Sequence, residues 1–380
     1  MRMIGIVILF VMAALGLGHS VAALKMTRGA ATATQADPAA AAPAKAASYR
    51  VVAVGDIMMG SDWPTPLLDP RLQPGASVED VIGPEMALIF KSADVVFGNY
   101  EGTIHTGSEG AKTCSNPSNC YTFRSPPFHA SFLAAMGFNM LSNANNHARD
   151  FGEAGRTATY TSLTKAGIEV SAADRDGMRF AVRTLDDGTR VSLVAFGHNP
   201  GLMPVTDLKR ATELIKQATN MGDFTIVSCH VGAEGSARQN VTRQQELFLG
   251  ENRGNPWAFA RAAIDAGADA VLCHGPHVSR AIEVYKGRLI AYSLGNFWTY
   301  GRFNLSGPSG LAPIVDFKVN KSGALQSARI ISVKQDRPGR PYLDTSHASA
   351  ATIARLTTTD FPEAGITISE TGEIKWPNPR

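Results

Sequence analysis

The sequence NMLSNANNHARD, residues 139–150, changes abruptly from an apolar run to a dense group of polar side chains. Asn139 to Leu141 is prone to form a strand, and three asparagines and His147 follow around a predicted strand-to-helix turn. Asparagine supplies a neutral carbonyl ligand, and histidine supplies a nitrogen ligand or a transferable proton. So many polar groups are hard to explain as core packing, and the segment therefore indicates a functional site.

Asp150, three residues after His147, allows two interpretations of equal weight. Its carboxylate can orient the imidazole of His147 and raise its pKa, as an adjacent negative charge does. Alternatively, Asp150 is a residue at the start of the helix that follows. We take His147 and Asp150 as the candidate catalytic residues.

Four other apolar runs also end in residues that bind metals or transfer protons. They are residues 49–54 before Asp56, 94–97 before Glu101, 224–228 before His230, and 269–272 before His274 and His277. Loops at the C-terminal ends of strands line the active sites of α/β proteins, so we expect these side chains to meet. With the turn described above, they give one predicted set of metal ligands: Asp56, Glu101, Asn146, His230, His274 and His277.

The chemistry of this set predicts one or two divalent ions. Mixed nitrogen and oxygen ligands suit Zn, Mn or Fe, whereas a structural zinc site would favour Cys. A bound ion lowers the pKa of a coordinated water towards ~7, and His147 would remain free to move a proton. The sequence has neither a Gly-rich phosphate loop ending in Gly-Lys-Ser/Thr nor a Gly-x-Ser-x-Gly elbow. Cys229 beside His230 could resemble a thiol nucleophile with its base. Neighbours along a strand point to opposite faces, however, so these two side chains would diverge.

Strands and helices are expected to alternate along the first two thirds of the chain, which predicts α/β layers. After Ile282 the pattern becomes β-rich, with strands expected at 289–294, 314–319 and 328–333. The expected helices span residues 128–136, 154–166, 208–218 and 256–266.

The N-terminus has the pattern of a targeting segment. Arg2 precedes an apolar run from Ile4 to about Gly18, and the small residues Ser20 and Ala22 follow with the spacing of a cleavage site. We expect a signal peptide over residues 1–22, with an uncleaved membrane anchor as the alternative. The remaining expected divisions are a flexible Ala/Pro-rich tether over 23–48, a folded domain over 49–345 and a C-terminal tail over 346–380. The protein is thus expected to be exported, periplasmic or extracellular.

Composition supports a folded domain and excludes one class of partner. The chain has 380 residues, of which 44% are hydrophobic, enough for a sizeable core. Its formal net charge is only +3 and no basic stripe is apparent, so we exclude a nucleic-acid partner.

The four cysteines fall into two pairs. Cys114 and Cys120 flank a predicted turn, so we expect a local disulfide outside the cytoplasm. Cys229 and Cys273 each end an apolar run directly before a histidine. We expect two small buried thiols there, while a second disulfide and a metal role remain alternatives.

Several motifs, in order, resemble the CapA-like family of poly-γ-glutamate capsule biosynthesis proteins, within the calcineurin-like metallophosphoesterase superfamily. The similarity runs from about Arg50 to Phe297, and it is most specific at two stretches, Asn-Asn-His and Ser-Leu-Gly-Asn-Phe. The motifs are residues 55–60, 98–104, 123–127, 145–147 with Asp150 and Gly152, 276–278, and 292–297.

The resemblance implies a four-layer α/β/β/α sandwich with a metal site at one edge. It places the six ligands named above near the metals and makes His147 the proton donor. Asn296 would line the site or hold its turn. The sequence departs from the wider superfamily at Met58, where that pattern has a histidine, although the CapA-like family shares the methionine. Cys273 and Gly275 also replace a usual Gly and His.

Two functions follow as hypotheses. The first is a metal-dependent hydrolase that acts outside the cytoplasm on a phosphoester or on a γ-glutamyl or cell-wall polymer. The second is a non-catalytic subunit that binds polymer within a capsule-synthesis membrane complex. The complete ligand set favours the hydrolase, whereas Met58 and the long tether favour the binding subunit.

Overall fold

Alternating apolar residues build two sheets in the computed structural model, which describes residues 48–114 and 120–377. The nine-stranded sheet has the order β23-β24-β20-β19-β1-β4-β7-β8, and β18 pairs with the end of β1. Strands β1, β4, β7 and β8 run parallel, so their C-terminal ends share one edge. Its strands are β1 Ser48–Met58, β4 Val95–Tyr100, β7 Met140–Ser142, β8 Glu169–Ser171, β18 Asn296–Thr299, β19 Ile314–Asn320, β20 Leu325–Ile331, β23 Thr367–Ile368 and β24 Glu373–Lys375.

The second sheet has seven strands, in the order β11-β10-β12-β15-β17-β16 with β9 beside β10. Its central strands β10, β12, β15 and β17 are also parallel. Its strands are β9 Phe180–Thr184, β10 Arg190–Gly197, β11 Met203–Pro204, β12 Phe224–His230, β15 Ala270–His274, β16 Ile282–Tyr285 and β17 Arg288–Ala291.

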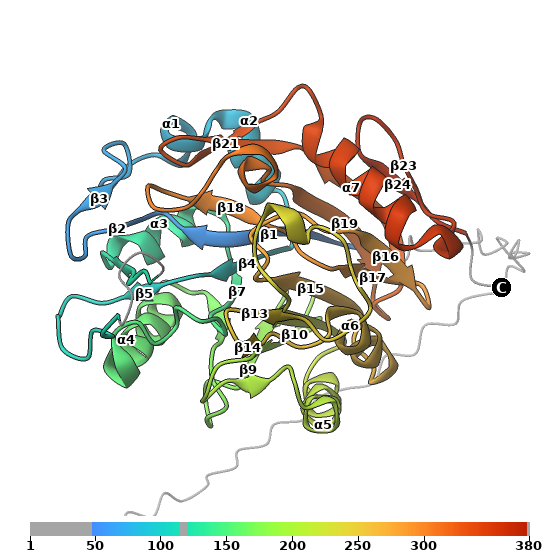
Figure 1. Cartoon of the computed structure of the whole chain (residues 1–380), viewed down its shortest axis with the longest axis horizontal. Helices are drawn as coiled ribbons and strands as arrows, with labels where there is room; N and C mark the ends of the chain where they lie inside the picture. Colours follow the sequence, from blue (N-terminus) through green and yellow to red (C-terminus); the bar gives the residue numbers. More distant parts are fainter. Residues whose placement is uncertain (1–47, 115–119, 378–380) are drawn as a thin grey trace, which may run out of the picture. The chain divides into compact units, whose positions relative to one another are not determined.

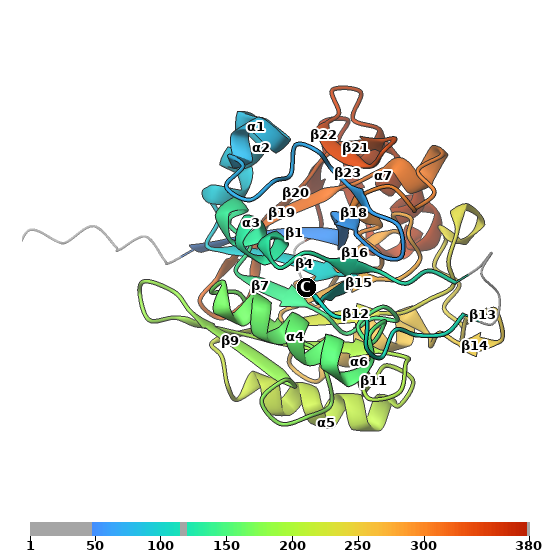
Figure 2. The same ribbon diagram turned by 90° about the vertical axis from the view of Figure 1, so that its left-hand side faces the viewer.

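Period-two alternation gives each sheet two apolar faces, and three cores result. Val51 and Phe97 point between the sheets and meet residues such as Leu193 of the second sheet. The opposite face of the nine-stranded sheet packs under helices α1–α4, and that of the seven-stranded sheet packs under α5 and α6. Figure 2 shows α1 and α2 beyond one sheet and α5 beyond the other. The four-layer α/β/β/α sandwich is therefore confirmed.

The predicted helices are found within a few residues of their expected bounds. Residues 128–136, 208–218 and 256–266 correspond to α3, α5 and α6, and residues 154–166 correspond to α4. The helices are α1 Val78–Ile82, α2 Pro84–Lys91, α3 Phe128–Met136, α4 Gly152–Lys165, α5 Leu208–Thr219, α6 Pro256–Asp265 and α7 Ala348–Asp360. Short strands complete the structure: β2 Gly60–Ser61, β3 Leu67–Leu68, β5 Thr103–Ile104, β6 Arg124–Ser125, β13 Leu247–Phe248, β14 Glu251–Asn252, β21 Val333–Asp336 and β22 Arg340–Leu343.

The expected tail over residues 346–380 is described as far as residue 377, and within it residues 348–375 add a helix and two strands to the same fold. Helix α7 places Ile353 in the core between the sheets. It places Leu356 in the core that lies between the seven-stranded sheet and helices α5 and α6. Strand β24 pairs with β20 and extends the nine-stranded sheet (Figure 1). These strands were not predicted because their local sequence signal is weak. The short strands β23 and β24 gain their stability from partners that are distant in sequence.

The expected signal peptide and all but the last residue of the expected tether lie outside the described residues. Within residues 48–114 and 120–377, no helix has both the length and the apolar character needed to cross a bilayer.

Candidate metal centre

Three of the six predicted ligands form a tight group where the two sheets meet. Asp56, Glu101 and His277 each offer a ligand atom, and these atoms all lie within 4.8 Å of one another. Both carboxylate side chains are completely buried, whereas the imidazole is 17% exposed. Two carboxylates and one imidazole at this separation form a group that could hold a divalent metal ion.

Parallel strand pairing brings Asp56 and Glu101 together. Asp56 lies beside Asn99 of β4 on one side and beside Asn296 of β18 on the other. The Asn99 side chain donates to Asp56 Oδ1 (2.8 Å), and Glu101 N donates to the Ile57 carbonyl (2.9 Å). The carboxylates are thus fixed by backbone register as well as by side-chain contacts.

Gly55 permits this close approach of β1 and β18. A Cβ atom at position 55 would lie 1.9 Å from the carbonyl oxygen of Gly295, so no other residue fits without backbone movement. Asp56 N donates to that same carbonyl (2.9 Å). The Gly-Asp pair that ends the first apolar run therefore combines a packing requirement at Gly55 with a candidate ligand at Asp56.

His277 is held with one nitrogen towards Asp56 and the other towards Glu101. Its Nδ1 lies 3.0 Å from Asp56 Oδ2 and 3.1 Å from Asn296 Oδ1, and its Nε2 lies 3.7 Å from Glu101 Oε1. The residue adopts a left-handed backbone with φ of 55°. Burial would lower the pKa of His277, but the charge of Glu101 and the contact with Asp56 raise it to about 10. The carboxylates of Asp56 and Glu101 thus favour the positively charged form of the His277 imidazole.

Glu101 provides the test of whether a metal fits. Neither of its carboxylate oxygens has a hydrogen-bond partner among the described residues, although both are buried. Burial, and then the charge of Asp56, raise the pKa of Glu101 well above its usual range. A buried carboxylate that accepts no hydrogen bond is costly even beside His277, and a coordinated cation removes that cost. The residues present therefore fit a divalent ion.

His230 and His274 lie outside the 4.8 Å group but sit opposite each other on β12 and β15. Both nitrogens of His230 and Nδ1 of His274 are buried and without hydrogen bonds among the described residues. His274 Nε2 lies 3.2 Å from Ser228 Oγ. Burial, with the positive charges of His198 and His277, lowers the pKa of His230 well below its usual range, and burial lowers that of His274 to about 4. Both imidazoles thus favour the neutral form, which is the form that binds a metal ion.

The three asparagines of the turn, at positions 143, 145 and 146, have two roles. Asn143 and Asn145 both donate to the Tyr100 carbonyl (2.8 Å each), and Asn145 also accepts from His147 N (3.1 Å). These two side chains hold the turn. Asn146, in contrast, has a buried side-chain oxygen without a hydrogen-bond partner in the described part of the chain and lines the same cleft as His277.

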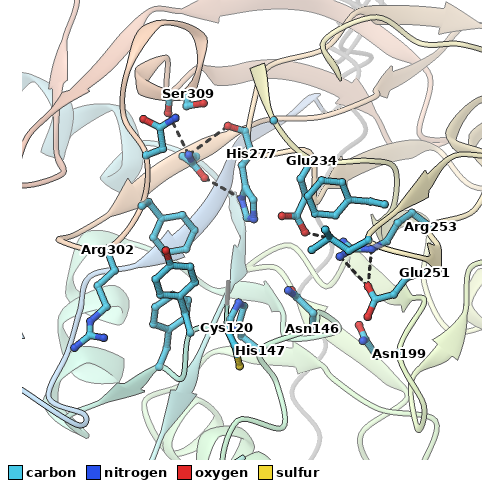
Figure 3. Close-up of a pocket in the computed structure, with 18 of the residues that line it drawn as sticks. Cys120, Asn146, His147, Asn199, Glu234, Glu251, Arg253, His277, Arg302 and Ser309 are labelled. Atoms are coloured by element: carbon cyan, nitrogen blue, oxygen red, sulfur yellow. Dashed lines mark hydrogen bonds and ion pairs between the residues drawn. The ribbon is translucent and has the colours of Figure 1, made fainter. Parts of the chain in front are cut away.

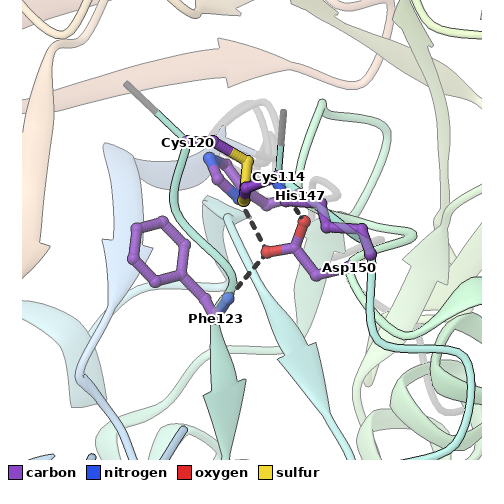
Figure 4. Close-up of a disulfide and its surroundings, with 6 residues drawn as sticks. Cys114, Cys120, Phe123, His147 and Asp150 are labelled. Atoms are coloured by element: carbon purple, nitrogen blue, oxygen red, sulfur yellow. Dashed lines mark hydrogen bonds and ion pairs between the residues drawn. A yellow bond between two sulfur atoms is a disulfide. The ribbon is translucent and has the colours of Figure 1, made fainter. Parts of the chain in front are cut away.

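His147 and Asp150 are hydrogen-bonded, with Nδ1 2.8 Å from Asp150 Oδ2 (Figure 4). Asp150 also accepts from Phe123 N (2.7 Å) and pairs with Lys112 Nζ (2.5 Å). Helix α4 begins at Gly152 after Phe151, so Asp150 orients the imidazole and does not cap the helix. Burial lowers the pKa of His147, against the opposing effect of Asp150.

The Cys114–Cys120 disulfide is present, as predicted, and lies beside His147 and Asp150 in Figure 4. Cys229 and Cys273, which we expected to be free thiols, form a second disulfide. The expectation was wrong because the parallel register places these two residues opposite each other with Cα atoms 4.5 Å apart. That register also pairs His230 with His274, on the face away from the disulfide.

A cleft of about 620 Å³ opens over this centre. Figure 3 shows His277, His147 and Asn146 in its middle, with Arg302 at one side and Arg253 at the other. Arg253 is paired with two carboxylates, Glu234 (2.8 Å) and Glu251 (2.9 Å). Phe303 stacks on Phe123 and meets the edge of His277 with ring centroids 5.3 Å apart in each case.

Sequence reasoning missed His198 and Asn199 at the end of β10. The imidazole of His198 stacks on that of His230 at 6.1 Å, and both of its nitrogens are buried without hydrogen bonds in the described part of the chain. Asn199 lines the cleft. The signal was available, because residues 191–196 form an apolar run ending in Gly-His-Asn, the same pattern that identified the other strand ends.

The chain is similar to several known proteins of capsule synthesis. It is 32% identical over 268 residues to "PGA biosynthesis protein CapA" of Bacillus subtilis (strain 168). This match covers 66% of this chain and 64% of that protein. It is 26% identical over 260 residues to "Capsule biosynthesis protein CapA" of Bacillus anthracis, covering 64% and 58% respectively. The matches therefore span less than two thirds of these relatives' own length.

Solved structures give weaker likenesses. The 5′-nucleotidase precursor of Thermus thermophilus has a TM-score of 0.38 and 10% identity, over 75% of this chain and 54% of that one. NAD nucleotidase of Haemophilus influenzae has a TM-score of 0.39 and 11% identity, over 83% and 56%. Residues 50–300 match the family model described as "Bacterial capsule synthesis protein PGA_cap", which spans most of the chain and includes Asp56, Glu101 and His277. The chain belongs to this family of bacterial capsule synthesis proteins.

Proposed function

We propose that this protein is an exported, metal-dependent hydrolase of capsule or poly-γ-glutamate biosynthesis. Its substrate would be a phosphoester or a γ-glutamyl or cell-wall polymer. The observation that carries the proposal is Glu101, whose two buried oxygens accept no hydrogen bond among the described residues and lie beside Asp56 and His277. Asn146, His230 and His274 complete the proposed ligand set, since each has a buried polar atom without a hydrogen bond in the described chain.

The chemistry divides between the ion and the protein. When bound, one or two divalent ions (Zn, Mn or Fe) supply Lewis acidity and make water a better nucleophile near neutral pH. The ion's ligands are distinct from His147, whose Nδ1 is engaged by Asp150. Nε2 of His147 is then the nitrogen that exchanges a proton with the leaving group. Asp150, Lys112 and the backbone of Phe123 hold the ring in this orientation.

His147→Ala and Asp150→Asn test this division of roles. We expect both variants to retain metal, because neither residue belongs to the Asp56–Glu101–His277 group. Hydrolysis should fall by roughly 10²–10⁴-fold, the usual contribution of a general acid or base. Elemental analysis and turnover of phosphodiester and γ-glutamyl substrates, measured on the same preparations, check the prediction. Loss of metal from the His147 variant would contradict it.

Export is supported by the two disulfides, because such bonds persist in oxidising compartments. Protein taken from its native compartment should yield no alkylated cysteine until it is reduced and denatured. Free thiols at Cys229 and Cys273 in that sample would argue against export.

A non-catalytic role in binding capsule polymer is the second candidate function. It is favoured by Met58, a completely apolar and buried side chain two residues after Asp56, where the wider superfamily pattern has a histidine. A protein that carries metal and binds polymer, yet hydrolyses none of the substrates tested, would support this role within a capsule-synthesis membrane complex.

A further inference from the structure

Three cationic side chains of Lys or Arg line the cleft, and their surroundings differ. Lys112 is paired with Asp150, and Arg253 is paired with Glu234 and Glu251. Arg302 has no carboxylate within 4.0 Å among the described residues. Its Nη2 donates only to the Thr65 carbonyl (3.2 Å), and its Nε is buried without a partner in the same part of the chain. Arg302 is therefore the one of these three cations that is not neutralised by the described protein.

The backbone fixes Arg302 relative to the metal centre. Strand β18 pairs with β1 at Asp56, and just beyond β18 the Tyr300 amide donates to the Met58 carbonyl (2.9 Å). Gly301 follows with φ of 93°, and a Cβ there would lie 2.2 Å from the Leu67 side chain. Phe303 then stacks against Phe123. Arg302 thus stands between two anchored residues and is not on a free loop.

Its place in the cleft indicates what it binds. In Figure 3 the side chain lies at one side of the cleft, while His277, His147 and Asn146 occupy the middle. A negative group bound there would belong to a neighbouring part of the substrate and not to the bond being broken. The opposite side, where two carboxylates surround Arg253, offers acceptors instead. The two ends of the cleft therefore differ in charge.

We infer that Arg302 is the specificity-determining anchor for an anionic group, carboxylate or phosphate, carried by an extended substrate one or more units from the reacting bond. A guanidinium with unused donors and no internal counter-ion matches planar oxyanions in charge and in geometry. The inference rests on the proposed function for the location of the reacting centre, but binding by Arg302 does not require hydrolysis.

The test is calorimetric binding by the full-length protein, with and without Mn²⁺, at one fixed ionic strength. The probes are a short γ-linked glutamate oligomer, its neutral carboxamide analogue and a glycerol-phosphate oligomer. Arg302→Gln should weaken binding of the preferred anionic oligomer by roughly tenfold to a hundredfold. Arg302→Lys should recover part of the loss, and the neutral analogue should bind both proteins alike. Arg355→Gln, an exposed arginine of α7 outside the cleft, is the matched control.

The wild-type preference between the two anionic oligomers identifies the source of the anionic group. The inference is overturned if Arg302→Gln binds the anionic oligomers as tightly as the wild type does. It is also overturned if neither oligomer binds the wild type, or if the neutral analogue loses equal affinity. If binding depends on Arg302 but the protein neither takes up metal when it is supplied nor turns over substrate, the proposed hydrolase is refuted and the anion site stands.

Discussion

The two sheets bring different chemistry to the edge where they meet. The nine-stranded sheet carries the candidate oxygen ligands, with Asp56 hydrogen-bonded to Asn99 and that residue in turn to Asn145. The seven-stranded sheet supplies imidazoles, and His230 has no hydrogen bond from either nitrogen among the described residues. Except at Glu101 and Asn146, the oxygen side is thus held by contacts within the protein, whereas both nitrogens of His230 and Nδ1 of His274 have no hydrogen bond among the described residues. The comparison teaches that one half of the centre is prearranged and the other is completed by what it binds.

The largest expected effect concerns Glu101, a candidate ligand on the oxygen side that accepts no hydrogen bond among the described residues. Glu101→Gln removes a charge while keeping the side chain's size, and we expect metal affinity to fall by about 1,000-fold, or about 4 kcal/mol. The metal-free variant should be more stable than the wild type by about 1 kcal/mol, because the removed carboxylate is buried and accepts no hydrogen bond among the described residues, and this outweighs the loss of its 3.7 Å contact with His277. Metal-buffered titration and urea unfolding in chelator measure the two quantities.

A control for that substitution is Glu85→Gln, in the exposed first turn of α2, which should change neither quantity. Full metal affinity in Glu101→Gln would break the comparison, since the oxygen side would then contribute no essential ligand.

The second prediction contrasts two buried histidines. His230→Ala removes a buried imidazole from the end of β12 and should weaken metal binding by about 100-fold, or about 2.7 kcal/mol. His129→Phe, in α3 on the far face of the nine-stranded sheet, should leave metal affinity unchanged, although His129 also has a buried nitrogen without a partner in the described residues. Equal losses in the two variants would mean that fold stability, not ligation, explains the effect of His230.

The smallest effect is a pH dependence of stability at His129. Burial lowers its pKa from 6.5 to about 3, so the folded protein holds the neutral imidazole. This contribution to stability is complete above pH 6.5 and is lost as the pH falls towards 3, by about 1.4 kcal/mol per pH unit. The unfolding free energy of the wild type minus that of His129→Phe should therefore decrease between pH 6.5 and 5.5. A difference that stays constant over this interval would contradict the prediction.

Local patterns were enough to predict strands and helices, because each apolar run before Asp56, Glu101, His230 and His274 is a strand. The Cys229–Cys273 bond, the Asn99–Asp56 contact and the pairing of Asn296 with Asp56 could not be predicted in the same way. Each depends on which strands are neighbours and in what register, and these properties are set by contacts between residues far apart in the chain. Metal occupancy and the role of each ligand remain predictions.

Strand β1 lies between β4 and β19. The first strand of the fold therefore gains one of its two main neighbours only from residues 314–320. Ser48 pairs with Asn320 and Ala53 with Val315. Contacts of such sequence separation slow folding, because the intervening chain must be ordered before they form. During synthesis, which proceeds from the N-terminus, one edge of β1 remains unpaired until residues 314–320 are available. The strand that carries Asp56 therefore has an edge open to pairing with other chains while the protein is being made.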